Sequence, residues 1–289
     1  MKKWLRLGVL SVLGLHPGCT GNPVSPPAQL HLESEHFVFE STTENASEAE
    51  MTEGLAVAEV LFDKVSTFLG PDHTPSDRIR VVLEGDYNTQ GAYVDFDGVH
   101  LFRYSLTNGG YWAVFAHEMV HAFGVPWFIA HAAWDWPTYR FFDEGFAEYV
   151  AAEVDPDRRG FPFFGFPEDV VVGHWVLTDT DIPPATLRER HEQLNTRCDL
   201  QAYSQRASWF RYLDESFGRA ATLQVVYPDV EPTSSIVRGI LGVGLDELDL
   251  RWDAWIRTRY ASYPGAGAVA QAYGDRTPWY QTCLAGVDF

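Results

Sequence analysis

The N-terminal part of the chain combines alternating and helical patterns. Residues 31–42, HLESEHFVFEST, alternate apolar with polar side chains and are rich in β-forming residues, which predicts a first strand. Apolar residues recur every three or four positions across 46–69, which predicts an amphipathic helix ending at Gly70 and Pro71. A second strand is predicted over 78–85, RIRVVLEG.

A β-hairpin is predicted next. The segments GAYVDF, 91–96, and VHLFRY, 99–104, both have strand-like composition. The dipeptide Asp97-Gly98 between them is typical of a tight hairpin turn. These two segments should therefore pair antiparallel.

From about residue 110 onward the pattern becomes helical. We predict helices over 110–123, from near Asp143 to 154, and over 199–217, with helical character continuing to about Tyr260. Strands come first and helices afterwards, which indicates an α+β fold. The mixed or antiparallel sheet would belong to an N-terminal lobe and most of the remaining helices to a C-terminal lobe.

The lobes are expected to span about 30–124 and about 125–289. With 289 residues, 46% of them hydrophobic and 15% aromatic, the chain can bury a substantial core. Its net charge of −19 is unfavourable for binding nucleic acid or an anionic lipid surface, so we expect neither as a partner.

The first residues resemble an export signal. Lys2, Lys3 and Arg6 precede an apolar run that is too short to span a bilayer, which predicts a cleaved leader over 1–18. Gly18-Cys19 resembles the lipidation site of bacterial lipoproteins, although an ordinary cleaved leader is the alternative. Either way, we expect an exported bacterial protein, anchored to the cell envelope by lipid or secreted. A lipid on Cys19 would be its only membrane attachment.

The segment after the predicted leader and the remaining cysteines fit this setting. Residues 19–29 include TGNPVSPPAQ, which is typical of a tether. If Cys19 carries lipid, Cys198 and Cys283 are the cysteines that remain. An oxidising compartment would allow these two to form a disulfide, and two buried free thiols are the alternative.

The segment VFAHEMVHAF, 114–123, carries the strongest chemical signal. His117 and His121 are four residues apart, so on a helix their imidazoles lie on one face and can bind one metal ion. Glu118 follows the first histidine, where it can act as general base in a zinc hydrolase of the HExxH type. A chance pair of core or surface histidines is the alternative.

A catalytic zinc site requires a third protein ligand and one open position. The metzincin pattern fails, because Trp127 occupies the place of its third histidine and no methionine follows Met119. A glutamate on a later helix is the other option, and DEGFAEY offers Glu144.

Three segments together resemble the thermolysin-like gluzincins, and in particular bacterial peptidase MA-like proteins. They are HEMVH, FFDEGFAEY and AYSQRASWFRYL, in the order that this family has them. The resemblance implies that Glu144 is the third zinc ligand and that Glu148 holds a ligand histidine, His117, in its metal-binding tautomer. We expect Asp143 to cap its helix rather than bind metal.

The resemblance also assigns a role to Tyr203, which would donate a hydrogen bond to the oxyanion during hydrolysis. A core tyrosine is the alternative, in which case His131, His174 and His191 are substitutes. Zinc would activate a water molecule, and Glu118 would take its proton and deliver it to the leaving amine.

We therefore expect a zinc metallopeptidase with its active site in a cleft between the two lobes. The hairpin strand before the active helix would receive an extended peptide or protein substrate. Val94 stands where related aminopeptidases have an acid for the substrate's amino terminus, which favours an endopeptidase. The alternatives are a metal-binding or scaffold protein without activity and a zinc hydrolase that cleaves another kind of bond.

Overall fold

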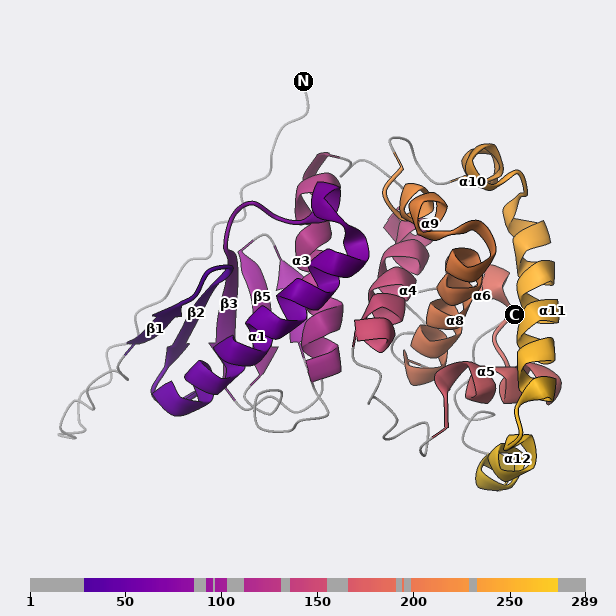
Figure 1. Cartoon of the computed structure of the whole chain (residues 1–289), viewed down its shortest axis with the longest axis horizontal. Coiled ribbons are helices and arrows are strands. Elements are labelled where there is room, and N and C mark those ends of the chain that lie inside the picture. Colours follow the sequence, from indigo (N-terminus) through magenta and orange to yellow (C-terminus); the bar gives the residue numbers. More distant parts are fainter. Residues whose placement is uncertain are drawn as a thin grey trace, which may run out of the picture.

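Strands at the N-terminal end of the chain and helices thereafter make up the fold (Figure 1). The computed structural model describes residues 29–85, 92–95, 97–102, 112–130, 136–154, 166–190, 194, 199–228 and 233–274. Outside these residues lie the predicted leader over 1–18, nearly all of the linker over 19–29, Cys19, Cys198, Cys283, His131 and His191.

All described strands precede α3, and α1 and η1 lie between the second and the third strand. The strands are β1 (Gln29–Glu33), β2 (Phe37–Thr42), β3 (Ile79–Glu84), β4 (Ala92–Asp95) and β5 (Gly98–Phe102). The helices are α1 (Glu48–Leu69), the 3-10 turn η1 (Pro71–His73), α3 (Trp112–Ala130), α4 (Trp136–Val154), α5 (Glu168–Leu177), α6 (Pro184–Glu189), α8 (Asp199–Phe217), α9 (Arg219–Val226), α10 (Ser234–Leu241), α11 (Leu245–Ser262) and α12 (Ala266–Gly274). The α+β prediction with a mixed sheet is confirmed.

The strands form one mixed sheet in the order β1-β2-β3-β5-β4. The central pairs β2/β3 and β3/β5 are parallel, whereas the outer pairs β1/β2 and β4/β5 are antiparallel. Parallel pairing requires a crossover connection, and α1 provides the one between β2 and β3. Among the described strands, β4 is therefore an edge.

The predicted single strand over 31–42 is in fact two strands, β1 and β2. The backbone N–H of Ser34 donates to the carbonyl oxygen of Phe37 over 3.0 Å and closes a turn between them. Alternation continues on both sides of this turn, so it did not reveal the reversal; the polar run at 33–36 was the signal. Phe37 and Phe39 of β2 point into the core.

The predicted hairpin at 91–104 is confirmed where it is described. β4 pairs antiparallel with β5, with Val94 opposite Val99. Gly98 has a φ of 140°, and a Cβ there would clash with the carbonyl oxygen of Arg80, so this turn position requires glycine. The carboxylate of Asp95 accepts hydrogen bonds from the N–H groups of Asp97 and Gly98 at 2.7 and 3.2 Å.

α1 and α3 supply the apolar side chains that cover one face of the sheet. α1 begins with a capping box, in which Ser47 and Glu50 each bond the other's backbone N–H. Phe62 of α1 and Phe115 of α3 both contact the ring of Phe37, at centroid distances of 5.8 and 5.9 Å. The opposite face carries polar pairs, such as Arg80 with Glu40 at 2.7 Å.

The remaining helices pack around α4 and α8, and buried ion pairs connect them. Arg211 of α8 contacts Asp169 of α5 at 2.7 Å. The guanidinium of Arg188 on α6 donates to both carboxylate oxygens of Asp249 on α11. None of the described helices combines the length and apolar character that crossing a bilayer demands.

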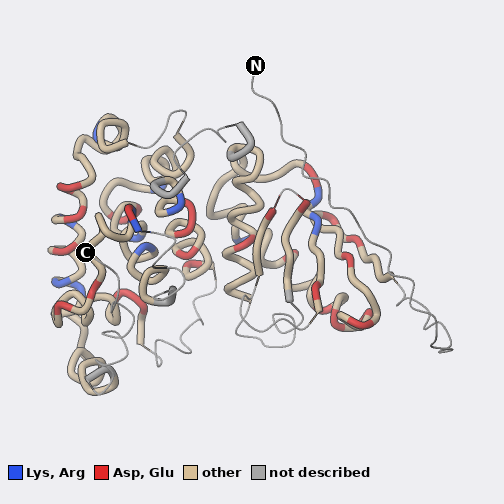
Figure 2. Tube along the Cα trace, turned by 180° about the vertical axis from the view of Figure 1, so that it is seen from behind, with Lys and Arg blue, Asp and Glu red and all other residues tan. Residues whose placement is uncertain are grey.

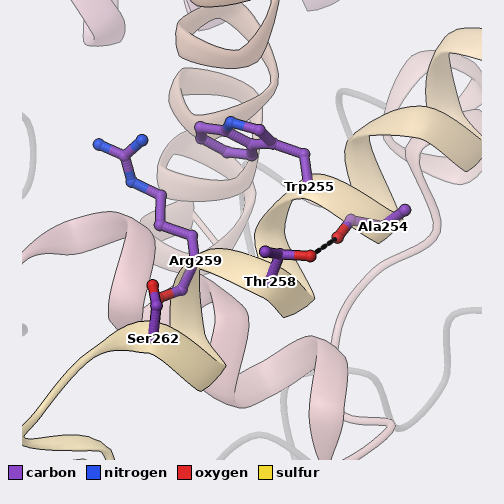
Figure 3. Close-up of a pocket in the computed structure, with 5 residues that line it drawn as sticks. All are labelled: Ala254, Trp255, Thr258, Arg259 and Ser262. Carbon is purple, nitrogen blue, oxygen red and sulfur yellow. Dashed lines mark hydrogen bonds between the residues drawn. The ribbon is translucent and has the colours of Figure 1, made fainter.

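Acidic positions and one depression can be followed over the described residues. Aspartate and glutamate positions are spread over the strands and the helices alike (Figure 2). A shallow depression along α11 is lined by Ala254, Trp255, Thr258, Arg259 and Ser262 (Figure 3). It contains none of the residues that the sequence predicted to be functional.

Candidate metal centre

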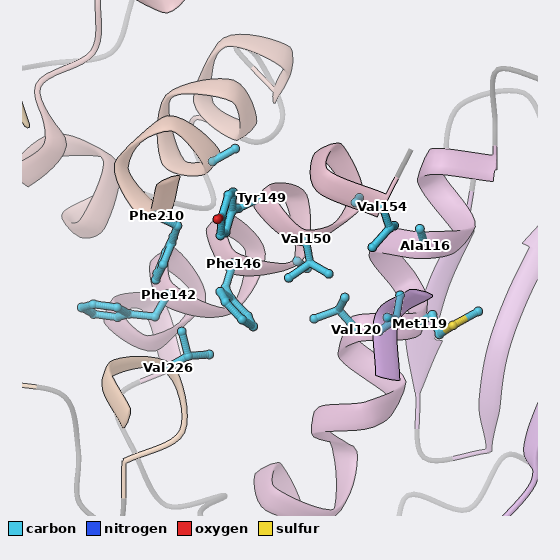
Figure 4. Close-up of a cluster of buried hydrophobic side chains, with 14 of the residues drawn as sticks. Ala116, Met119, Val120, Phe142, Phe146, Tyr149, Val150, Val154, Phe210 and Val226 are labelled. Atoms are coloured by element: carbon cyan, nitrogen blue, oxygen red, sulfur yellow. The ribbon is translucent and has the colours of Figure 1, made fainter. Parts of the chain in front are cut away.

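α4 lies between α3 and α8 and brings the predicted site residues together (Figure 4). Its residues Val150 and Val154 point toward α3 (Figure 4), while the rings of Phe142 and Phe146 lie 6.2 and 5.7 Å from that of Phe210 on α8. All four side chains are buried. This apolar packing on both sides fixes α4 relative to the two helices that carry the other predicted residues.

α3 is longer than the sequence predicted. We expected an end at Phe123, before Gly124 and Pro126, but the helix continues to Ala130 with Pro126 inside it. Packing explains the difference, since Trp127 stacks on Tyr139 of α4 with ring centroids 5.3 Å apart. Such tertiary contacts can outweigh the local preference of glycine and proline.

α4 begins earlier than predicted, and this changes the role of Asp143. The helix starts at Trp136 rather than near Asp143, so the prediction that Asp143 caps it is wrong. Pro137 in the first turn was the available signal, because proline is favoured at that point of a helix. Asp143 instead lies in the second turn, buried and directed at α3.

His117, His121 and Glu144 converge on one point, as the sequence predicted. The Nε2 atoms of the two imidazoles are 3.0 Å apart. Oε2 of Glu144 lies 3.2 Å from Nε2 of His117 and 3.4 Å from Nε2 of His121. The three residues could therefore hold a metal ion.

The donor set fits a tetrahedral transition metal. Zinc binds imidazole nitrogen and carboxylate oxygen at about 2.0–2.1 Å, and donors at two corners of such a tetrahedron are about 3.3 Å apart. The three separations of 3.0, 3.2 and 3.4 Å are close to that value. Three protein donors also leave one tetrahedral position for solvent or substrate.

Two carboxylates orient the imidazoles from behind. Nδ1 of His117 lies 3.0 Å from Oε2 of Glu148, and Nδ1 of His121 lies 3.0 Å from Oδ1 of Asp143. An imidazole that donates from Nδ1 turns the lone pair of Nε2 toward the ion. The expected contact between Glu148 and His117 is thus present, and Asp143 does the same for His121.

The charges of this centre favour a bound cation. Burial lowers the pKa of His117, but hydrogen bonds to Glu144 and Glu148 outweigh it and raise that pKa to about 9. Burial also lowers the pKa of His121, but the contact with Asp143 outweighs this effect and raises that pKa well above the usual value. Burial alone would raise the pKa of Glu144, yet its bonds to both imidazoles hold it well below the usual range. Without a metal, protons on the histidines must compensate these acids.

Glu118 is buried beside the same centre. Its side chain follows His117 on α3, and the residue is 9% exposed. Burial raises the pKa of its carboxyl group, with the nearby acids Glu144 and Asp143 adding to the effect. A carboxyl group shifted in this direction is better suited to exchange protons near neutral pH.

Tyr203 of α8 reaches the centre from the other side. Its ring lies 5.6 Å from that of His117 at an interplanar angle of 71°. Burial, followed by the charge of Glu144, raises the pKa of the phenol, which therefore stays protonated and able to donate. Gln205, in the same AYSQ segment, holds the backbone of Ile182 through two hydrogen bonds of 2.9 and 3.0 Å.

The only substitute for Tyr203 within the described residues lies elsewhere. His174 is on α5, where its ring is 6.0 Å from that of Tyr260 on α11. Burial lowers its pKa, as expected for a histidine packed between helices. His174 therefore packs between α5 and α11 and is not placed to replace Tyr203 at the metal centre.

Two arginines near Glu144 were not anticipated from the sequence. Arg140 lies one turn before it, with Nη1 3.9 Å from Oε1 of Glu144, and Arg206 of α8 is fully buried. The position of Arg206, three residues after Tyr203 within an apolar helical pattern, was the signal available.

No protein-family model matches the chain, and no curated protein sequence is similar to it. The assignment of a function therefore depends on the geometry and chemistry of the residues described above.

Proposed function

We propose that this protein is a zinc-dependent peptidase of the gluzincin type. The observation that carries the proposal is the convergence of His117, His121 and Glu144 with separations of 3.0–3.4 Å, next to the buried acid Glu118. A structural zinc site is closed by four protein ligands, whereas the described residues supply three. The resemblance of HEMVH, DEGFAEY and AYSQRASWFRYL to gluzincins supports the same assignment.

The chain's own residues have distinct roles in the proposed reaction. Zinc, when bound, would supply a Lewis acid that polarises the scissile carbonyl and acidifies water. Glu118 takes a proton from the attacking water and delivers it to the leaving amine. Glu148 and Asp143 hold the two imidazoles in place, and Tyr203 donates a hydrogen bond to the oxyanion.

The proposed substrate is an extended peptide beside β4. As an edge strand among those described, β4 can accept a further strand through its backbone. α3 contacts both β4 and β5, so a peptide bound there would lie near the metal ligands. The proposal includes a cleft between a sheet-containing lobe and a helical lobe. Val94 lies on β4, and the sequence resemblance gives it the place of the aminopeptidase acid, which supports cleavage within a chain.

The proposed location is outside the cytoplasm. The basic start and apolar run before residue 19 support export, and Gly18-Cys19 supports lipid attachment. Labelling cells with a fatty-acid analogue would test the attachment, since Cys19→Ser should abolish incorporation into the protein.

Metal content and cleavage by the protein lacking residues 1–18 test the function. We expect about one zinc per chain, cleavage of peptides from a mixed library, and loss of cleavage by Glu118→Gln with zinc retained. Glu247→Gln is the matched control, because Glu247 is exposed and pairs with Arg251 one turn later on the same helix.

The other outcomes identify the alternatives. Zinc with no cleavage of any peptide, in wild type as in Glu118→Gln, would indicate a metal-binding protein without activity. Hydrolysis of ester or amide model substrates but not peptides would indicate a hydrolase for another kind of bond. Absence of stoichiometric metal would contradict the proposal as a whole.

A further inference from the structure

Arg206 is a fully buried guanidinium at the crossing of α4 and α8. Its exposed fraction is 0%, and its Cζ lies 5.5 Å from the ring centroid of Tyr203. A Cβ added at Gly145 would be 2.7 Å from the Cβ of Arg206, so this arginine packs directly against the backbone that follows Glu144.

The charges around Arg206 belong to the metal centre. Burial lowers the pKa of Arg206 to about 10, and the groups that act in the opposite direction are Tyr203, Glu144 and Glu148. The guanidinium is thus charged at neutral pH. Burying an ionised group is costly unless nearby charges compensate it, and the compensating acids here are the third metal ligand and the partner of His117.

We propose that Arg206 is a positioning residue for the hydrolysis proposed above, holding the ring of Tyr203 and offsetting the charge of Glu144 and Glu148. The catalytic part of this inference rests on the proposed function. A guanidinium over an aromatic face restrains the ring and is attracted to it. A cation beside the phenol also makes its O–H a better donor to an oxyanion.

The same charge has an opposite effect on metal binding. Glu144 and Glu148 attract a divalent cation more strongly when no arginine offsets their charge. Loss of the guanidinium should therefore strengthen zinc binding while it weakens catalysis. A residue that only supports the packing of α4 on α8 would weaken both when replaced.

The test compares Arg206→Met and Arg206→Lys with Arg211→Met. Arg211 is a matched control on the same helix, because it is largely buried but pairs with Asp169 and Glu153 away from the metal centre. Zinc affinity is measured by competition with a chelator. The values of kcat and KM are measured for each variant with Tyr203 present and with Tyr203→Phe.

We expect Arg206→Met to bind zinc about tenfold more tightly and to lose about 10- to 100-fold in kcat with little change in KM. The loss in kcat should largely disappear in the Tyr203→Phe background. Arg206→Lys should keep the zinc affinity of the wild type, and Arg211→Met should change neither quantity.

Weaker zinc binding by Arg206→Met, or an equal loss of kcat in both Tyr203 backgrounds, would overturn the inference. If Arg206→Met does not fold, Arg206→Lys decides, since weakened zinc binding in that variant would also overturn it and an unchanged affinity with reduced kcat would support it. If the wild type binds zinc but cleaves nothing, the proposed function fails, and zinc affinity alone then decides the role of Arg206.

Discussion

Asp143 and His121 are joined by a hydrogen bond of 3.0 Å between Oδ1 and Nδ1. The hydrogen bond between Glu148 and His117 has the same length and also involves Nδ1 of the histidine. Both acids belong to α4 and both histidines to α3, so the two helices position the donor atoms jointly. Each imidazole is thereby held with its Nε2 directed at Glu144.

We predict that Asp143→Ala weakens zinc binding. Removing the carboxylate releases the ring of His121 and leaves its Nδ1 without this acceptor, which typically costs about 10- to 100-fold in metal affinity or activity. Competition with a chelator measures the affinity. Asp253→Ala is the control, because Asp253 is half-exposed and pairs with Arg257 on α11. Equal affinities for wild type and Asp143→Ala would show that this hydrogen bond does not orient the ligand.

We predict that Tyr203→Phe lowers kcat with little effect on KM. Loss of one donor to an oxyanion typically costs about 3 kcal/mol, or roughly 100- to 1000-fold in kcat. Zinc content should stay at the wild-type level, because His117, His121 and Glu144 remain in place to hold the ion. Steady-state kinetics on a cleaved peptide give both constants. An unchanged kcat would make Tyr203 a packing residue.

Two helical glycines should respond in opposite directions to alanine. At Gly145 a Cβ would lie 2.7 Å from Arg206 Cβ and 2.9 Å from the ring of Phe210, so Gly145→Ala should destabilise the fold by about 1–3 kcal/mol. At Gly239 on α10 an added Cβ would meet no described atom within 4 Å beyond the adjacent backbone, so Gly239→Ala should stabilise it by up to about 1 kcal/mol. Urea unfolding measures both changes. A stabilising Gly145→Ala would contradict the close packing of α4 on α8.

His174 should contribute to loss of stability in acid. Burial lowers its pKa from the usual 6.5, so below that value the unfolded chain binds a proton more readily than the folded one. The contribution of His174 is complete above pH 6.5 and is lost as pH falls toward its folded pKa. His174→Gln should therefore lose less of its unfolding free energy between pH 7 and pH 5 than wild type does.

His31 provides the control for this measurement. It is exposed, and its hydrogen bond to Glu33 raises its pKa, so its contribution has the opposite sign. His31→Gln should not reduce the loss of stability in acid. If His174→Gln and wild type lose the same free energy, His174 does not contribute.

Local patterns in the sequence were sufficient for His117 and His121, whereas the resemblance to gluzincins named Glu144 as the third donor. His117 and His121 are separated by one helical turn, and Glu144 stands in a segment with its own helical spacing. A catalytic zinc requires a third protein ligand, and the resemblance implied that Glu144 meets the two histidines. The hairpin at Asp97-Gly98 was similarly local, since the turn chemistry lies in two adjacent residues.

The remaining features depend on contacts between distant segments. The role of Asp143 required the true start of α4, which the sequence placed too late. The length of α3 beyond Pro126 depends on the stacking of Trp127 on Tyr139. Arg206 stands in an apolar helical pattern, but its place beside the metal ligands depends on the packing of α8 on Gly145. Such effects arise from tertiary packing rather than from local preference.

The position of α4 has a consequence for resistance to proteolysis. α3 contacts the sheet, and α4 contacts α8. An ion held by His117, His121 and Glu144 would therefore cross-link the N-terminal and the helical parts of the chain. Separating those parts would require breaking ligand bonds as well as apolar contacts. Proteolysis between these two parts should then be slow with zinc present and fast after chelation, even if the helices themselves remain intact.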